Sequence, residues 1–126
     1  MQGDGNFVVY KIDGGAKTAL WSSQTTNKGT GPYKLRLEGS NNLVMYDKDS
    51  TTIWDSGSAI DHVTSSSGYV RMQNNGNLAI FTGDDTRLWN SDTKHGKVSG
   101  MMGTGKLFIS KYYFRNLVVY LNYILF

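Results

Sequence analysis

Residues 1–10 read MQGDGNFVVY, and this stretch recurs twice, as LEGSNNLVMY at residues 37–46 and as MQNNGNLAIF at residues 72–81. Each copy contains a short apolar run that follows a turn rich in glycine or asparagine. The copies are offset by 36 and then 35 residues. Recurrence at such a period indicates one supersecondary unit used three times, with a core formed where the units stack.

A tryptophan follows every copy, as Trp21, Trp54 and Trp89. Turn residues stand between the apolar run and the tryptophan, so each unit contains a second hairpin. The first of these hairpins, through residues 13–15, is three residues longer than the other two. Because the tryptophans recur regularly, we expect the indole rings to pack towards a shared axis rather than to stack on ligands.

The units are predicted to be β-structure. The chain has 15 Gly, 1 Pro and no Cys, a composition typical of short strands joined by Gly, Asn, Asp and Ser turns. Asp4-Gly5 and Asn75-Gly76 are dipeptides favoured in tight hairpins, where a positive φ is required. No segment before residue 100 shows a sustained helical period. We therefore predict an all-β fold of three small antiparallel sheets around a pseudo-threefold axis.

The first unit lacks a segment that the other two possess. Residues 35–38 align with residues 70–73, and the corresponding residues would precede Met1. We expect the domain to be N-terminally incomplete, or to receive the missing strand from elsewhere.

Composition divides the chain into three parts. Residues 1–93 form the repeat domain, with units at 1–30, 31–67 and 68–93, and residues 94–105 resemble a glycine-rich linker. Residues 106–126 form an apolar, basic tail without Gly, Asp or Glu. All 10 acidic residues precede residue 93, so the positive net charge of +3 comes from the basic residues that follow it. We therefore expect no nucleic-acid binding by the repeat domain.

Three interpretations of the tail stay open. It supplies strands in place of the missing N-terminal ones, forms a strand between molecules, or is a non-native extension. A homodimer or higher homo-oligomer through strand exchange would follow from the second. The longest apolar run, residues 117–126, is about half of a membrane span, so we expect no transmembrane helix. Neither this run nor residues 1–20, which lack an apolar signal region, indicates a compartment.

Polar residues at every second position distinguish the first copy. A turn at Asp4-Gly5 would fold the segment back and gather an amide, a carboxylate, a second amide, an apolar floor and a phenol. Such a set suits a polyhydroxylated ligand, because it offers donors and acceptors without any group that must change protonation state. The residues are Gln2, Asp4, Asn6, Val8 and Tyr10.

This Q-x-D-x-N-x-V-x-Y pattern resembles, at all five positions, the signature of the bulb-type (monocot mannose-binding) lectins. The threefold recurrence with a following Trp is similar to the same family and covers about residues 1–93. The resemblance implies a β-prism II fold and binding of mannose or mannose-rich glycans, multivalent through repeats or oligomers. It also implies that Gln2, Asp4, Asn6 and Tyr10 hydrogen-bond the sugar, while Val8 makes the apolar contact.

The other two copies depart from the pattern. The second has a glutamate and a serine, Ser40, in place of Gln and Asp, and its candidate residues are Glu38, Asn42, Val44 and Tyr46. The third has Asn for Asp, Ala79 for Val and Phe81 for Tyr, and its candidate residues are Gln73, Asn75 and Asn77. We expect these two sites to be degenerate, with polar residues that mainly cap hairpin turns.

No catalytic pattern is present, so we expect a binding protein and not an enzyme, without metal or cofactor. Cys is absent, and His62 and His95 have no partner motif. Two alternatives to a lectin stay open. One is a degenerate β-prism scaffold or protein-interaction module that binds no sugar. The other is a membrane-active role for the cationic, apolar tail.

Overall fold

The computed structural model describes residues 3–13, 16–60, 68–73, 75–93 and 109–110. This part of the chain contains strands and turns, and no helix. The strands are β1 (Val8–Asp13), β2 (Ala16–Ser22), β3 (Lys34–Leu37), β4 (Leu43–Tyr46), β5 (Thr52–Asp55), β6 (Tyr69–Met72), β7 (Leu78–Phe81), β8 (Arg87–Asn90) and β9 (Ile109–Ser110).

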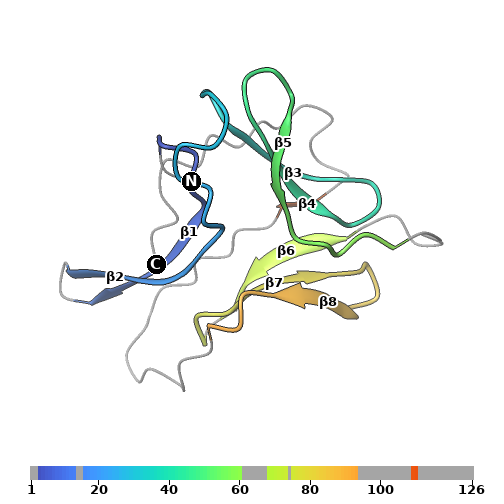
Figure 1. Cartoon of the computed structure of the whole chain (residues 1–126). Coiled ribbons are helices and arrows are strands. Elements are labelled where there is room, and N and C mark those ends of the chain that lie inside the picture. Colours follow the sequence, from blue (N-terminus) through green and yellow to red (C-terminus); the bar gives the residue numbers. More distant parts are fainter. Residues whose placement is uncertain (1–2, 14–15, 61–67, 74, 94–108, 111–126) are drawn as a thin grey trace.

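Each repeat builds its own antiparallel sheet, and the three sheets surround a common centre (Figure 1). The first sheet pairs β1 with β2, the second has the order β3-β4-β5, and the third has the order β8-β7-β6-β9. The prediction of an all-β chain with three small antiparallel sheets is therefore confirmed. Among the described residues, no helix is long and apolar enough to cross a membrane.

Residues 109–110 lie in the region predicted to be a tail, and they add a strand to the third sheet. Ile109 pairs with Val70, and Ser110 pairs with Tyr69. They therefore extend the sheet of the third repeat and not the shorter sheet of the first. The linker at 94–105 and the rest of the tail lie outside the described residues.

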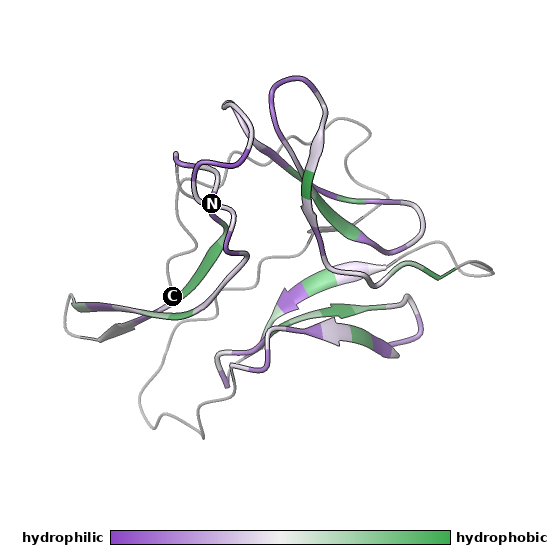
Figure 2. Ribbon diagram, in the orientation of Figure 1, coloured by the Kyte–Doolittle hydropathy of each residue, from purple (hydrophilic) through white to green (hydrophobic). Residues whose placement is uncertain are grey.

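Alternate side chains along β1, β4 and β7 point into a common core. Val9, Met45 and Ile80 are fully buried at equivalent positions. Phe7, Leu43 and Leu78, two residues earlier, are buried as well. In Figure 2 the most hydrophobic stretches of the ribbon lie on strands of the three sheets.

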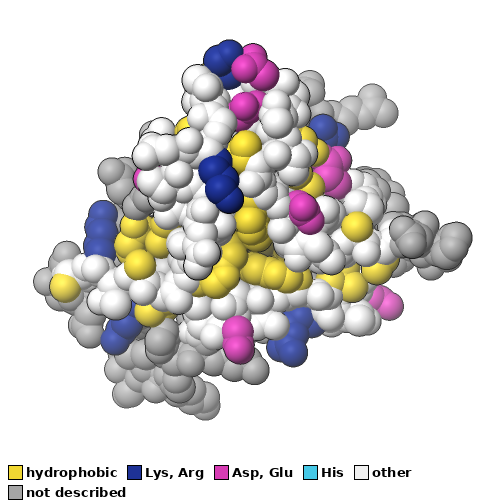
Figure 3. Space-filling view, viewed as in Figure 1, with side chains coloured by type: hydrophobic (Ala, Val, Ile, Leu, Met, Phe, Trp, Pro, Cys, Tyr) yellow, Lys and Arg dark blue, Asp and Glu magenta, His cyan; other side chains and the backbone are white. Residues whose placement is uncertain are grey.

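The tryptophans pack around the axis, as predicted from their recurrence. The ring centroids of Trp21 lie 5.5 Å from those of both Trp54 and Trp89, and Trp54 and Trp89 are 6.1 Å apart. All three contacts are edge-to-face, an arrangement that aromatic quadrupoles favour. Hydrophobic side chains gather where the three sheets meet on the face in Figure 3.

A β-bulge that was not predicted from the sequence occurs at the same place in every repeat. The register shifts between Val9 and Tyr10, between Met45 and Tyr46, and between Ile80 and Phe81. At each bulge the strand that carries the tryptophan has one residue more than its partner strand. Two consecutive side chains of that strand can therefore face the core. Ile53-Trp54 and Leu88-Trp89 use it in this way, and all four side chains pack against the core.

Candidate functional site

The sequence motifs lie along the central strands, on the face opposite the core. Val8, which is 5% exposed, and the half-buried Tyr10 alternate with the fully buried Val9 on β1, while Asp4 and Asn6 lie in the turn that precedes the strand. Gln2 lies outside the described residues. The structure therefore places four of the five residues of the first motif on one turn and the strand that follows it.

The turn of the first motif is held by Asp4 and Gly5. Asp4 Oδ1 accepts a hydrogen bond from the Asn6 amide at 3.0 Å. Gly5 has φ +83°, and a Cβ there would lie 2.6 Å from the ring of Tyr33. Only glycine fits this position, because both the backbone angle and the ring exclude a side chain. The predicted positive-φ turn at Asp4-Gly5 is confirmed.

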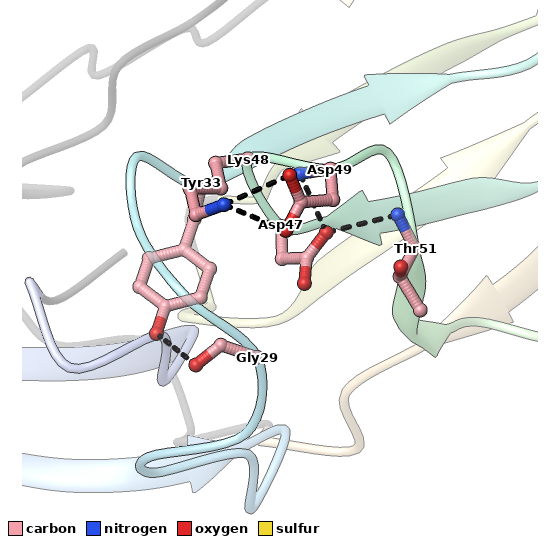
Figure 4. A network of polar contacts seen from close by, with 6 residues as sticks. All are labelled: Gly29, Tyr33, Asp47, Lys48, Asp49 and Thr51. Carbon is pink, nitrogen blue, oxygen red and sulfur yellow. Dashed lines mark hydrogen bonds and ion pairs between the residues drawn. The ribbon is translucent and has the colours of Figure 1, made fainter.

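Tyr33 connects this turn to the second repeat, and Figure 4 shows its hydroxyl at Gly29. Its ring is buried against Gly5, and its hydroxyl donates to the carbonyl of Gly29 at 3.2 Å. Gly29 in turn lies close against Asp47. A Cβ added to Gly29 would be only 2.8 Å from the Asp47 Cβ. The first motif therefore takes its support from the hairpin of the second repeat.

Asp47 organises that hairpin. Its Oδ1 accepts the amide hydrogens of Asp49 and Thr51, both at 2.9 Å (Figure 4). The Thr51 amide is the main reason why the pKa of Asp47 lies below its usual range, and the Asp49 amide contributes in the same direction.

The motif asparagine of each repeat is tied into the fold by a serine and a second hydroxyl residue. Asn6 Oδ1 accepts from Ser23 Oγ at 3.2 Å and from the Thr25 amide at 3.3 Å. Thr25 Oγ1 donates to the carbonyl of Gly5 at 2.6 Å. We call this arrangement the asparagine lock; its other members are Asn42 with Ser56 and Ser58, and Asn77 with Ser91 and Thr93.

The lock was not predicted, although the sequence carries a signal for it. A serine stands two residues after each tryptophan, and a serine or threonine stands four residues after it. The residue between them has a positive φ in every repeat, at Gln24, Gly57 and Asp92. The carbonyl oxygen of the motif asparagine therefore serves the fold, and only its amide NH₂ is left for other partners.

The use of that NH₂ distinguishes the three motifs. In the second, Asn42 Nδ2 donates to Asp55 Oδ1 at 3.3 Å. In the third, Asn77 Nδ2 donates to Gln73 Oε1 at 3.4 Å and to Asn90 Oδ1 at 3.1 Å. Within the described ranges, Asn6 Nδ2 makes no hydrogen bond, and neither does the second carboxylate oxygen of Asp4.

The second motif is closed by contacts among its own residues. The Tyr46 hydroxyl donates to Glu38 Oε1 at 2.8 Å, and Arg36 Nε lies 3.5 Å from the same oxygen. Burial raises the pKa of Tyr46, and the hydrogen bond to Glu38 raises it further. Val44 is nearly buried beside this pair.

In the third motif, Asn75 Oδ1 accepts the Asn77 amide at 3.1 Å, as Asp4 accepts that of Asn6. Phe81 stacks on Tyr69, with ring centroids 5.3 Å apart. Ala79 and Asn77 are fully buried.

No cluster of three or more metal-ligating side chains occurs in the part of the chain that the structure describes. His62 and His95 lie outside it. The described groups of the motifs can donate and accept hydrogen bonds around an apolar floor, which is binding chemistry.

Comparison with solved structures identifies the fold. Crystal structures of monomeric monocot mannose-binding lectins from Gastrodia elata match with a TM-score of 0.63 and 27% sequence identity, over 75% of this chain and 78% of theirs. A lectin from Allium sativum matches with a TM-score of 0.48 and 29% identity, over 54% of this chain and 62% of its own. The snowdrop (Galanthus nivalis) agglutinin, solved with methyl-α-D-mannoside, matches with a TM-score of 0.46 and 23% identity, over 65% and 73%.

No protein-family model matches the chain, and no curated protein matches it. The likeness to the Gastrodia lectins confirms the expected β-prism II fold. The shared fold therefore supports the resemblance of the chain to the bulb-type lectin family.

Proposed function

We propose that the chain is a carbohydrate-binding lectin and that the first motif binds mannose or the mannose residues of larger glycans. The proposal is supported by the fold shared with the Gastrodia elata mannose-binding lectins and by the agreement of Gln2, Asp4, Asn6, Val8 and Tyr10 with the bulb-type signature. The observation that carries it is that, among the described residues, Asn6 Nδ2 and the second carboxylate oxygen of Asp4 have no hydrogen-bond partner.

The proposed chemistry assigns one task to each group. The second oxygen of Asp4 accepts from sugar hydroxyls, and Asn6 Nδ2 donates to one. Val8 meets the C–H face of the ring, and Tyr10 and Gln2 complete the site at its two ends. A carboxylate acceptor suits this task, because charge-assisted hydrogen bonds are about twice as strong as neutral ones.

Neutral sugar binding is proposed at the first motif only. The amide NH₂ of Asn42 and Asn77 and the hydroxyl of Tyr46 already have protein partners, so a sugar would have to displace those hydrogen bonds. Avidity for mannose-rich glycans would then come from linking several chains, which strengthens binding without new contacts.

The experiment compares Asp4→Asn with the wild type in binding of methyl α-D-mannoside. The variant keeps the turn, because Asn75 makes the same hydrogen bond in the third repeat. It loses the charge, which weakens a hydrogen bond by about 1–1.5 kcal/mol, or about tenfold in affinity. Asp49→Asn is the control: it makes the same change at an exposed hairpin carboxylate outside the three motifs and leaves mannoside affinity unchanged. Equal affinities of wild type and Asp4→Asn would contradict the proposed role of Asp4.

A second candidate function is a scaffold or protein-interaction module that binds no sugar. It is favoured by the internal hydrogen bonds of the second motif. There Tyr46 donates to Glu38, and Asn42 donates to Asp55. The same titration separates the candidates, because a scaffold shows no saturable response to mannoside in either protein.

A further inference from the structure

The outer face of the third sheet carries an arginine held on two aromatic rings. The guanidinium carbon of Arg71 lies 4.9 Å from the centroid of the Tyr69 ring and 5.5 Å from that of Phe81. The two rings are stacked on each other with an interplanar angle of 16°. A guanidinium on an aromatic face is attracted by the ring quadrupole, so the contact fixes the position of the charge.

The equivalent arginine of the second sheet provides an internal comparison. Arg36 is directly opposite Val44, as Arg71 is opposite Ala79, and Arg36 forms an ion pair with Glu38. In the third repeat Gln73 stands where Glu38 stands in the second. Arg71 makes no ion pair or hydrogen bond within the described ranges, so its charge is not neutralised there.

The surroundings of Arg71 add a second positive charge. Arg87 on β8 is the register partner of Phe81 and is exposed. Of the two acidic residues in the hairpin between β7 and β8, Asp85 accepts the hydroxyl hydrogen of Tyr69 and Asp84 accepts that of Thr82. Gln73 and Asn75, both half-buried, lie at the other end of the motif and carry amide groups.

We infer that this face, which we call the Arg71 face (Tyr69, Arg71, Gln73, Phe81 and Arg87), binds a sugar that carries an anionic group. The inference rests on the proposed sugar-binding function, and it assigns to the third motif a ligand different from that of the first. The planar guanidinium presents its N–H groups as a fork that matches the two oxygens of a carboxylate or sulfate. The side-chain oxygens of Gln73 and Asn75 accept from Asn77, and their NH₂ groups can donate to hydroxyls of the same ring.

The loss of the neutral-sugar groups supports this assignment. Phe81 has no hydroxyl, and Ala79 leaves no exposed apolar surface, because its side chain is fully buried. Asn77 is fully buried and has its NH₂ bonded to Gln73 and Asn90. The Arg71 face has thus exchanged the groups that suit a neutral sugar for a fixed cation on an aromatic support.

The test is an NMR titration of the full chain with three probes at constant ionic strength. The probes are methyl α-D-mannoside, its uronic acid form, and its 6-sulfate. We expect the uronate or the sulfate to shift the backbone amides of Arg71 and Gln73 in a saturable way, and the neutral mannoside to leave them in place. The more effective of the two anionic probes identifies the group that is recognised. Sodium acetate and sodium sulfate at the same concentrations serve as ion controls.

Three variants sharpen the test. Arg71→Gln should weaken binding of the anionic probe by about tenfold, and Arg71→Lys should weaken it by a smaller factor, because it keeps the charge without the fork. Arg36→Gln is the matched control, since it removes the equivalent arginine of the second sheet, and it should have no effect. If Arg71→Gln does not fold, the comparison of Arg71→Lys and Arg87→Gln with the wild type decides the question.

Failure of this inference and failure of the proposed function give different results. Shifts at Asp4 to Asn6 with neutral mannoside, but none at Arg71 with either anionic sugar, would overturn only the inference. It is equally overturned if acetate or sulfate reproduces the shifts, or if Arg71→Gln binds the anionic probe as tightly as the wild type. No response anywhere to any of the three sugars would overturn the proposed function as well.

Discussion

Asn6 shows how one side chain serves both the fold and the proposed site. Its carbonyl oxygen accepts from Ser23 and Thr25, and its NH₂ group has no partner among the described residues. Because an amide carries an acceptor at one end and two donors at the other, the fold can fix its orientation while the donor end stays available. The equivalent amides of Asn42 and Asn77 are used at both ends.

Gly5 is predicted to be essential for the first motif. Gly5→Ala places a Cβ against the Tyr33 ring at a backbone angle that side chains rarely adopt, so we expect a loss of about 1–3 kcal/mol in unfolding free energy and of mannoside binding. Gly57→Ala is the control, because Gly57 has a similar φ but nothing within 4 Å of the added Cβ. It should cost about 1 kcal/mol from the backbone alone. Equal costs in urea unfolding would show that the contact with Tyr33 is unimportant.

Asp47 is predicted to make stability depend on acid pH. Its pKa is lowered in the folded state, so its contribution is present above the pKa of the unfolded chain and is lost as pH falls through the folded value. Asp47→Asn should therefore flatten the dependence of unfolding free energy on pH below about pH 4. Urea unfolding at several pH values measures this. Asp49→Asn is the control, because that carboxylate accepts only from the exposed Lys48 among the described residues. An unchanged profile in Asp47→Asn would contradict the role of the amide hydrogen bonds.

At the scale of elements, the asparagine lock joins the turn before the central strand to the segment after the tryptophan. Its members are buried in the third repeat, where Asn77 is fully enclosed. Asn77→Ala leaves the Ser91 hydroxyl and the Thr93 amide without their acceptor, so we expect a loss of about 2–4 kcal/mol in unfolding free energy. Gln73→Ala removes only the half-buried, weaker partner of Asn77 and should cost less than about 1 kcal/mol. Comparable losses in the two variants would refute a structural role specific to the lock.

The hairpins could be predicted from sequence because their determinants are local. The apolar runs, the Asp4-Gly5 and Asn75-Gly76 turns, and the hairpin before each tryptophan all occur where their residue types place them. The bulges were not predicted, because each depends on how the two strands of a hairpin come into register. The lock was not predicted, because it joins side chains at least 14 positions apart, such as Asn6 with Ser23 and Asn77 with Ser91. The stack of Arg71 on Tyr69 and Phe81 has the same origin, since it crosses two strands. Gln2, which the signature includes, lies outside the described residues, so its role stays a prediction.

At the scale of the whole molecule, the three sheets depend on one another through the tryptophan cluster. Trp54 contacts Trp21, Trp89 and Phe7, which come from all of the other repeats. Trp54→Leu should lower the unfolding free energy by about 2–4 kcal/mol, because it leaves a cavity among half-buried rings. It should do so for all sheets together, in one denaturant transition seen by both fluorescence and circular dichroism. Tyr46→Phe, which removes only a hydroxyl from an outer face, is the control. Separate transitions for the two probes would show that the sheets unfold independently.

The central claim is that sugar binding is located at the first motif. The most direct measurement is a titration of the full chain with methyl α-D-mannoside, followed through the backbone amide shifts of the three turns. We predict saturable shifts at Asp4, Gly5 and Asn6, with the equivalent amides of the second turn, residues 40–42, unmoved. The absence of shifts at Asp4, Gly5 and Asn6 at high-millimolar mannoside, in a folded protein, would contradict the claim.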